Sequence, residues 1–348
     1  MKRFVFPLLC VLFLVFVWYN RAQADSFWHV LRGAALFPLL VAIALQIGTL
    51  FNQPALFQSI YTLVGIGAKW RELVPVVLAG RFINVVAPAA GLGETALLFE
   101  QAKRRNWETP RVALATTLYF GLNFAVFALI LVVGFAFLAV RGDLRSFEIV
   151  AAVPLLLGLF AGACLLVWLA KNPDAFARRA QQLATRLPRF LRDRFEFLSS
   201  PDQVVREFSV ALRALRGERG GWLRPIVHAL LVDLLEIAVL GACISAFAVP
   251  VTPVLLIAGY AVSTLFTIVS ISPQGLGAVE GALGGTLVSL GVSLPHATAI
   301  VLLYRGLSFW LPLLVGFAAT RLWTGTLTTA SVSSATASNA SSHSVEAR

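Results

Sequence analysis

Two segments of this chain combine helix-breaking residues with a glutamate inside sequence apolar enough to lie in a bilayer. The first is Asn84 to Glu94, NVVAPAAGLGE, and the second is Ser270 to Glu280, SISPQGLGAVE. Proline and paired glycines break helices, and an acidic side chain at the centre of a membrane helix costs about 2.5–3.5 kcal/mol. Irregular backbone is tolerated at membrane depth only where it is buried in protein or lines a wet cavity. The two segments therefore predict a polar site inside a membrane protein.

The composition fits this setting. Of 348 residues, 58% are hydrophobic and 13% are charged, and the mean hydropathy is +0.82, which is typical of chains with several membrane spans. The net charge of +11 comes from Lys and Arg clustered between apolar runs, as in cytoplasmic loops, so we expect no nucleic-acid partner. Three cysteines, all inside apolar runs, indicate packing residues rather than a disulfide framework.

Apolar runs and loop charges predict an all-α integral membrane protein, a polytopic helical bundle of about six full spans plus two inverted re-entrant hairpins. Phe4 to Tyr19 is either an uncleaved first span or a cleaved signal, because Ala22-Gln23-Ala24 resembles a signal-peptidase site. A second span is expected from Gly33 to Phe51, and Phe57 to Ala68 is expected to lie along the interface. The later full spans are expected at residues 112–140, 149–170, 225–248 and 297–323.

The two hairpins are predicted from helices too short to cross a bilayer. Leu73 to Pro88 and Glu94 to Arg105 flank the first break, and Val251 to Ile271 and Ala278 to Leu290 flank the second. Basic residues at both ends of the first hairpin place its mouth in the cytoplasm, and the second hairpin then opens to the outside. The half-helices would aim their N-terminal dipoles into a shared cavity, where an anion such as phosphate is favoured.

We expect one transmembrane domain at residues 1–323, followed by a disordered Ser/Thr/Ala-rich tail at 324–348. Within the domain, residues 171–224 form a polar cytoplasmic loop with 12 Lys and Arg against 6 Asp and Glu. This loop is either a topology determinant or a docking surface for a partner enzyme. The predicted location is the inner (cytoplasmic) membrane, multi-pass, with both the N- and the C-terminus in the cytoplasm.

The candidate substrate-binding residues come from the two motifs and the arginines near them. Glu94 and Glu280 either contact substrate or proton, or cap the hairpins through backbone N–H groups. The two arginines are either bidentate phosphate ligands or structural counter-ions of these glutamates. The full set is Arg81, Asn84, Pro88, Gly91, Gly93, Glu94, Ser270, Pro273, Gly275, Gly277, Glu280 and Arg305.

A secondary polar cavity is expected at Asp233 and Glu236, which lie three residues apart on one helix face and line a wet vestibule or take up a proton or metal. Gln46 and Asn123 are expected to donate hydrogen bonds between helices. No metal site, cofactor or catalytic residue is expected, because the histidines lack metal-ligand spacing and no metalloprotease, serine-hydrolase or nucleotide-binding motif occurs.

The motif residues also carry a family resemblance. N-x-x-x-P before Gly91-Leu92-Gly93-Glu94, then S-P-Q-G-L-G-A-V-E-G, Tyr304-Arg305 and Phe309-Trp310-Leu311-Pro312, resembles the lysylphosphatidylglycerol synthase transmembrane region, also called the flippase-like domain. The resemblance covers about residues 4 to 323 and describes a stand-alone member without the aminoacyl-transferase domain. Thr95 to Phe99 lacks the base that such domains usually carry after the first Gly-Glu, so no headgroup preference is carried over.

The resemblance implies a lipid flippase or transporter, not an enzyme. It would move an anionic or lipid-linked headgroup across the cytoplasmic membrane by alternating access between the inverted hairpins. The implied partners are a membrane phospholipid, a lipid-linked glycan or a hopanoid-type lipid. The alternative is a non-transporting membrane subunit that recruits a lipid-modifying enzyme or a glycosyltransferase.

Overall fold

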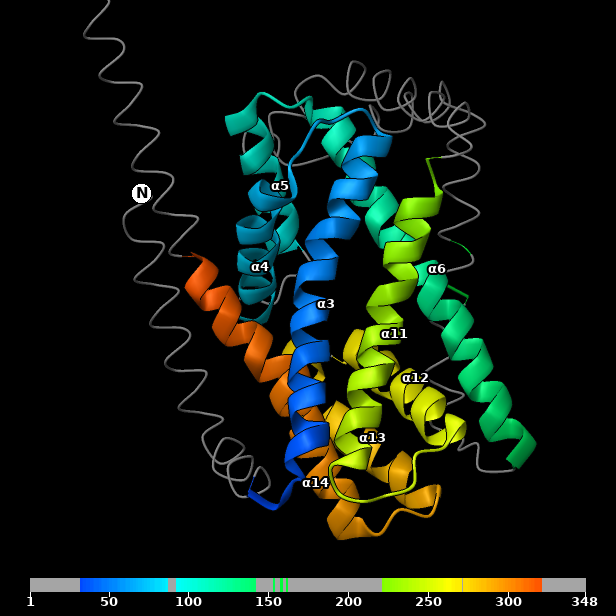
Figure 1. The fold of residues 1–348 in the computed structure, drawn as a ribbon. Helices are drawn as coiled ribbons and strands as arrows, with labels where there is room; N and C mark the ends of the chain where they lie inside the picture. Colours follow the sequence, from blue (N-terminus) through cyan, green and yellow to red (C-terminus); the bar gives the residue numbers. More distant parts are fainter. Residues whose placement is uncertain are drawn as a thin grey trace, which may run out of the picture.

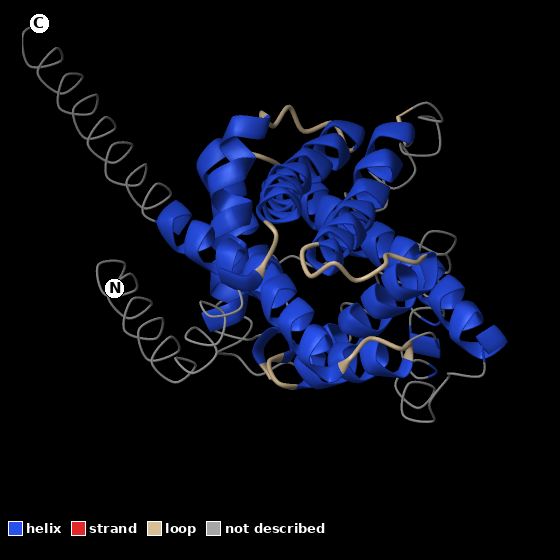
Figure 2. Cartoon of the chain, turned by 60° about the horizontal axis from the view of Figure 1, so that its bottom comes forward, coloured by secondary structure: helices blue, strands red, loops and turns tan. Residues whose placement is uncertain are grey.

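The computed structural model describes residues 32–86, 92–141, 221–270 and 272–320, together with positions 153, 157, 158 and 161. Every regular element within these ranges is helical (Figures 1 and 2). The labelled helices are α3 (Leu36–Leu63), α4 (Trp70–Val86), α5 (Leu92–Arg105), α6 (Thr109–Arg141), α11 (Leu223–Ser245), α12 (Pro253–Val269), the 3-10 turn η2 (Pro273–Gly275), α13 (Ala278–Ser289), α14 (Leu294–Arg305) and the π-helical turn η3 (Gly306–Trp310).

Four helices in the described ranges are long and apolar enough to cross a membrane: Leu36–Leu63, Thr109–Gly134, Leu223–Ser245 and Leu294–Thr320. Each exceeds the roughly 20 residues that a bilayer requires. The last runs from α14 through η3 to residue 320 without interruption. The chain is thus an all-helical membrane protein. The predicted spans at 4–19 and, apart from four positions, at 149–170 lie outside the described residues, as do nearly all of the 171–224 loop and the tail.

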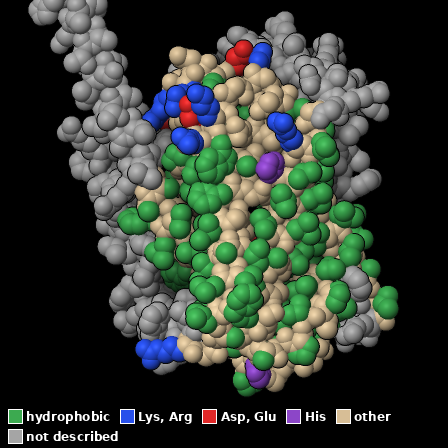
Figure 3. All heavy atoms as spheres, in the orientation of Figure 1, with side chains coloured by type: hydrophobic (Ala, Val, Ile, Leu, Met, Phe, Trp, Pro, Cys, Tyr) green, Lys and Arg blue, Asp and Glu red, His purple; other side chains and the backbone are tan. Residues whose placement is uncertain are grey.

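The outer surface agrees with contact to lipid. Hydrophobic side chains cover the middle of the face in Figure 3, and its Lys and Arg side chains lie toward the two ends. Phe37, Leu40 and Ile47 on α3 and Leu231 and Leu234 on α11 are exposed. Because water would make such a continuous apolar belt unfavourable, it fits a surface solvated by acyl chains.

Helix α3 corrects one prediction. We expected a span ending at Phe51 and an interfacial segment after it, but α3 continues through Pro54 to Leu63. The polar residues that suggested an end have partners on other helices: the Asn52 amide donates to the His228 carbonyl, and Gln53 donates to the Tyr119 hydroxyl. Satisfied polar groups and a proline are tolerated inside a membrane helix. The predicted interfacial segment is therefore largely core, and its Phe57 side chain is fully buried.

Two pairs of short helices pack as antiparallel hairpins. Helices α4 and α5 have 17 and 14 residues, and α12 and α13 have 17 and 12. At 1.5 Å per residue their lengths are about 18–26 Å, shorter than a hydrocarbon core of about 30 Å. In the first hairpin the Cα of Gly80 faces Glu94, and in the second Gly259 faces Leu283 and Leu287.

The mouths of the two hairpins lie at opposite ends of α3. The first hairpin follows the C-terminal end of α3, after a short connection to Trp70. The second follows the end of α11, where the Ala246 carbonyl accepts a hydrogen bond of 2.8 Å from the N–H of Ala35 at the N-terminal end of α3. Figure 1 accordingly shows α4 and α5 in its upper half and α12 and α13 in its lower half.

The two broken segments approach each other inside the bundle. Phe82 and Val85 near the end of α4 form one buried cluster with Phe309 and Leu313, and Leu276 from the second break packs against this cluster. The first motif is therefore in apolar contact with the second, although nearly 200 residues separate them, at 84–94 and 270–280. Val85 of the first motif and Leu276 of the second therefore belong to the same apolar cluster inside the bundle.

Candidate functional site

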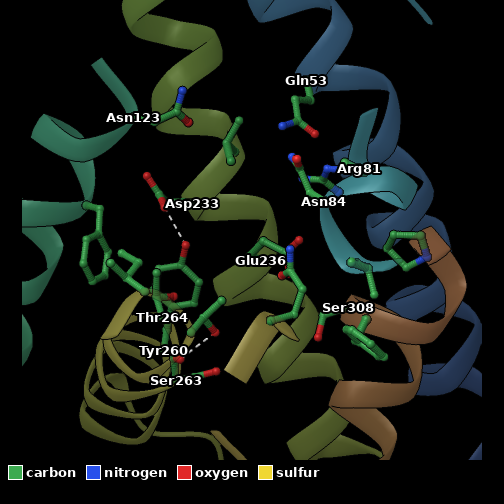
Figure 4. A pocket seen from close by; sticks show the side chains of 18 of the residues that line it. Gln53, Arg81, Asn84, Asn123, Asp233, Glu236, Tyr260, Ser263, Thr264 and Ser308 are labelled. Atoms are coloured by element: carbon green, nitrogen blue, oxygen red, sulfur yellow. Dashed lines mark hydrogen bonds between the residues drawn. The ribbon is translucent and has the colours of Figure 1, made fainter. Parts of the chain in front are cut away.

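A cavity of about 370 Å³ lies inside the bundle, between α3, α4, α5, α6, α11, α12 and the α14–η3 span. Its wall is partly aromatic, through Phe120, Phe124, Phe127 and Phe309, and otherwise unusually polar for the interior of a membrane bundle. Figure 4 shows polar side chains from several helices pointing into this space. The polar and charged wall residues are Gln53, Arg81, Asn84, Glu94, Tyr119, Asn123, Asp233, Glu236, Tyr260, Ser263, Thr264, Thr267, Gln274, Tyr304, Arg305 and Ser308.

The first motif presents Glu94 to the cavity through close packing of α4 against α5. A Cβ added to Gly80 would lie 2.8 Å from Glu94 Cγ, and one added to Gly93 would lie 2.5 Å from Ile83 Cγ2. Only glycine permits this approach at both positions. The Glu94 N–H donates to Asn84 Oδ1 at 3.2 Å, and Asn84 Nδ2 donates to Glu94 Oε2 at 3.4 Å. Asn84 therefore holds both the start of α5 and the Glu94 side chain.

Glu94 retains an unsatisfied atom. Its side chain is 5% exposed, and its Oε1 is buried without a hydrogen-bond partner in the described part of the chain. Pro88 and Gly91, the other candidates from this motif, lie outside the described residues, so their predicted role stays a prediction.

Arg81 does not form the direct pair with Glu94 that the counter-ion alternative required. It lines the cavity half-buried, and within the described residues it makes no hydrogen bond and no ion pair shorter than 4 Å. Its charge nevertheless acts on Glu94 and on Glu236 through the low-dielectric interior. The N–H donors of the Arg81 guanidinium are thus available to a ligand in the cavity.

The second motif is held more tightly. Arg305 Nε donates to Glu280 Oε1 at 2.8 Å, and Arg305 Nη2 donates to the Gln274 carbonyl at 3.0 Å. The guanidinium also lies over the Phe309 ring, 4.9 Å from its centroid. The other Glu280 oxygen accepts the Gly277 N–H at 2.6 Å, which caps α13. These contacts have the geometry of the capping and counter-ion alternatives for Glu280 and Arg305.

The backbone of this break explains its glycines. Gly275 and Gly277 have φ angles of +71° and +84°, and a Cβ on Gly275 would lie 2.5 Å from Val279 Cγ2. Ser270 bonds the Ser272 hydroxyl at 2.8 Å, and Pro273 begins η2. Ser270, Gly275, Gly277 and Glu280 form the turn rather than the cavity wall, where Gln274 lies instead, and the predicted role of the Pro273 side chain stays a prediction.

Asp233 and Glu236 both line the same cavity as the motif residues, rather than a secondary one. Tyr260 donates its hydroxyl to Asp233 Oδ1 at 2.5 Å, and Gln46 Nε2 donates to Glu236 Oε1 at 3.4 Å. The expected interhelical role of Gln46 is therefore confirmed. Asn123 was predicted wrongly, because its amide donates to the Tyr119 carbonyl of its own helix at 2.8 Å.

Several wall residues escaped the sequence reasoning. Gln53 was interpreted as part of a helix end, and Tyr119, Tyr260 and Tyr304 were hidden in apolar runs where a tyrosine is unremarkable. Gln53 was the residue from which this site could have been predicted. A buried side-chain amide needs a hydrogen-bond partner, so its place in an apolar segment indicates a polar group on a neighbouring helix. Tyr119 supplies that partner, and its ring stacks on Phe57 with centroids 3.8 Å apart.

The described residues define a helical membrane protein with four candidate spans and a charged internal cavity. Residues 4–316 match the family described as the lysylphosphatidylglycerol synthase TM region, and the chain belongs to this family. It is also similar to a UPF0104 membrane protein of Methanothermobacter thermautotrophicus, with 26% identity over 261 residues, or 74% of this chain and 76% of that protein.

Proposed function

We propose that this protein moves a lipid with an anionic or lipid-linked headgroup between the leaflets of the cytoplasmic membrane. The observation that carries the proposal is Arg81, a guanidinium without a hydrogen-bond or ion-pair partner in the described residues, on the wall of a polar cavity inside an apolar bundle. Arginine binds phosphate oxygens in bidentate geometry, and the low-dielectric surroundings of a membrane bundle strengthen that interaction. A phosphate-bearing headgroup is the natural occupant.

The dimensions of the cavity support a headgroup rather than a whole lipid. A volume of about 370 Å³ is at the lower end of the usual range for small-molecule sites. Acyl chains would remain in the surrounding bilayer, against the exposed apolar surface formed partly by α3 and α11. In this arrangement only the polar part of the lipid crosses through protein, which removes the largest barrier to its passage.

Movement would come from the two hairpins. Their mouths lie at opposite ends of α3, which supports a movement in which each hairpin opens the cavity toward a different side of the membrane, as inverted repeats do in alternating access. The π-helical turn η3 adjoins the contact between them and contributes Ser308 to the wall. Single π-helical turns are frequent at functional sites and provide a place where a helix can adjust.

Movement of a lipid between leaflets requires no covalent chemistry. The alternative, an accessory subunit that docks an enzyme through the 171–224 loop, stays a prediction because nearly all of that loop lies outside the described residues. The two differ in a direct way: a transporter moves lipid as a purified protein, whereas a docking subunit requires its loop and its partner.

The test reconstitutes the full chain in liposomes containing fluorescent phosphatidylglycerol, with dithionite quenching as the measure of lipid exchange between leaflets. We expect exchange to accelerate over protein-free liposomes, and Arg81→Ala to reduce it at least tenfold, because loss of a charged hydrogen-bonding pair corresponds to about 1.5–3 kcal/mol.

The matched control is Arg111→Ala, which removes a surface arginine paired with Glu108 at 2.7 Å, outside the cavity. We expect it to exchange lipid at the wild-type rate. A folded Arg81→Ala protein as fast as Arg111→Ala would remove Arg81 from the proposal. A wild-type protein that moves neither phosphatidylglycerol nor a lipid-linked glycan would refute transport and leave the docking role.

A further inference from the structure

The charged groups on the cavity wall do not balance. The wall carries two arginines, and Arg305 is already neutralised by its 2.8 Å ion pair with Glu280. Only Arg81 remains to balance three wall carboxylates, so within the described residues the cavity has an excess of two negative charges when all three are ionised. An uncompensated charge in a low-dielectric interior is very unfavourable. The three carboxylates belong to Glu94, Asp233 and Glu236.

Hydrogen bonds compensate only half of each carboxylate. One oxygen of each accepts a bond, from Asn84, Tyr260 or Gln46 respectively. The other oxygen is buried and has no partner among the described residues: Glu94 Oε1, Asp233 Oδ2 and Glu236 Oε2. A carboxylate in this position is destabilised, whereas a carboxylic acid is neutral and gains an O–H donor that can turn toward the cavity.

A bound metal ion does not fit the arrangement. In the described ranges, no three His, Cys, Asp or Glu side chains converge closely enough to hold one. The three carboxylates instead lie on α5 and along α11, and Figure 4 shows Asp233 and Glu236 on one helix, with Arg81 and Asn84 on another part of the wall, which is α4. Carboxylates that do not share a metal ion are neutralised separately, and a proton on each carboxyl group is the simplest way to do this.

We infer that the cavity takes up protons together with its anionic headgroup, and that at least two of Glu94, Asp233 and Glu236 are protonated when the anion binds at Arg81. The inference rests on the proposed transport and adds its energy source, the proton gradient. An anionic headgroup would be repelled by a cavity that already carries an excess of negative charge. Once two of the carboxylates are neutral, the cavity has no excess negative charge and the phosphate can pair with Arg81.

Other ionisable groups face these carboxylates from every side. Tyr61 on α3 and Tyr119 on α6 interact with Glu94, and Tyr119 also interacts with Asp233. Arg81 on α4, Arg305 and Tyr304 on α14, Tyr260 on α12 and Cys243 on α11 interact with Glu236. The tyrosines and the cysteine are neutral at neutral pH, so the arginines and the three carboxylates set the charge of the cavity.

Proton uptake and anion binding are then linked reciprocally. Because the bound state holds more protons than the empty state, the apparent affinity for the anion rises as pH falls, by up to about tenfold per pH unit for each proton taken up. An amide in place of a carboxyl group mimics the protonated form and removes its share of this slope. The double variant Asp233→Asn/Glu236→Gln should therefore have a flatter pH dependence than either single variant.

The first experiment is infrared spectroscopy of the full chain in vesicles of ether-linked phosphatidylcholine at neutral pH, before and after addition of glycerol phosphate. Neither the vesicles nor this anion contain carboxylic ester groups, so the C=O region of carboxylic acids stays clear. We expect a C=O stretching band from protonated carboxylic acids that grows when the anion is added, and a smaller increase in at least two of the variants Glu94→Gln, Asp233→Asn and Glu236→Gln. The control Glu108→Gln, at a 58% exposed side chain, should leave the band unchanged. A spectrum without the band, or a band insensitive to all three variants, overturns the inference whether or not lipid moves.

The second experiment titrates dihexanoyl phosphatidylglycerol into the same protein by calorimetry in buffers of different ionisation enthalpy. We expect the protein to take up protons on binding and the double variant to take up fewer. Binding without proton uptake would overturn the inference and leave the transport proposal standing. Absence of binding would count against transport, and the infrared bands would still decide the protonation state.

Discussion

The ion pair between Glu280 and Arg305 offers the sharpest test of how the second break is held. Glu280→Gln removes the charge at the N3 position of α13 but keeps an oxygen that can accept the Gly277 N–H, so the cap survives and only the ion pair is lost. Arg305 remains behind with an 8% exposed side chain and no counter-charge.

The expected cost follows from that burial. Breaking a buried pair by removing one partner costs about 3–5 kcal/mol. The lower figure applies here, because Glu280 is 18% exposed and the Arg305 donor to the Gln274 carbonyl is retained. For a chain of this size, each kcal/mol lowers Tm by about 2 °C, so we expect a decrease of about 6 °C.

The assay is the intrinsic fluorescence of the purified protein in detergent during a thermal ramp. The control Glu108→Gln removes a pair whose side chains are 40% and 58% exposed, and should lower Tm by less than about 2 °C. The double variant Glu280→Gln/Arg305→Met leaves no stranded charge and should recover part of the loss. Equal Tm values for Glu280→Gln and Glu108→Gln would refute the assignment of a buried pair.

Two further predictions concern packing and orientation. Gly80→Ala should lower stability by about 1–3 kcal/mol and slow lipid exchange, because its Cβ would lie 2.9 Å from Glu94 Cα, whereas Gly281→Ala meets nothing within 4 Å and should be neutral or stabilising in the same thermal ramp. Single cysteines at Arg71 and Ser293, in a background without other cysteines, should react with a membrane-impermeant maleimide from opposite sides of the membrane, with Arg71→Cys labelled only from the cytoplasm; labelling from one side would contradict the inverted arrangement.

The positions of the breaks could be predicted because their signals are local. Proline and glycine interrupt a helix wherever they occur together, so Gly275 and Gly277 marked the second break correctly, and their positive φ angles give the reason. Long apolar runs located α6 and α11 within a few residues for an equally local reason. The same segments are the basis for expecting an interior site, since a glutamate in such a break requires polar neighbours, and Glu94 does line a polar cavity whereas Glu280 does not.

The partners of the polar residues could not be predicted, because partners are set by packing between helices. Gln53 and Pro54 have the appearance of a helix end until Tyr119 is known to lie opposite. Asn123 was assigned to a neighbouring helix, yet it satisfies itself on its own backbone, as polar side chains in helices often do. Arg305 pairs with Glu280, whereas Arg81 has no ion-pair partner among the described residues. The sequence could not distinguish the two, since both are single arginines in apolar segments.

That distinction bears on how the molecule would move. The second break is fixed by an ion pair of 2.8 Å and a capping bond of 2.6 Å, whereas the first is joined through Asn84 by contacts of 3.2 and 3.4 Å. Charge-assisted bonds are shorter and stronger than those of amides, so among the described residues the Asn84–Glu94 contacts are weaker than the contacts of Glu280. Segments that move in function come from the less stable parts of a fold. We therefore expect the α4–α5 hairpin to respond first when an anion binds Arg81, because binding changes the charge balance around Glu94 and leaves the Glu280–Arg305 pair intact.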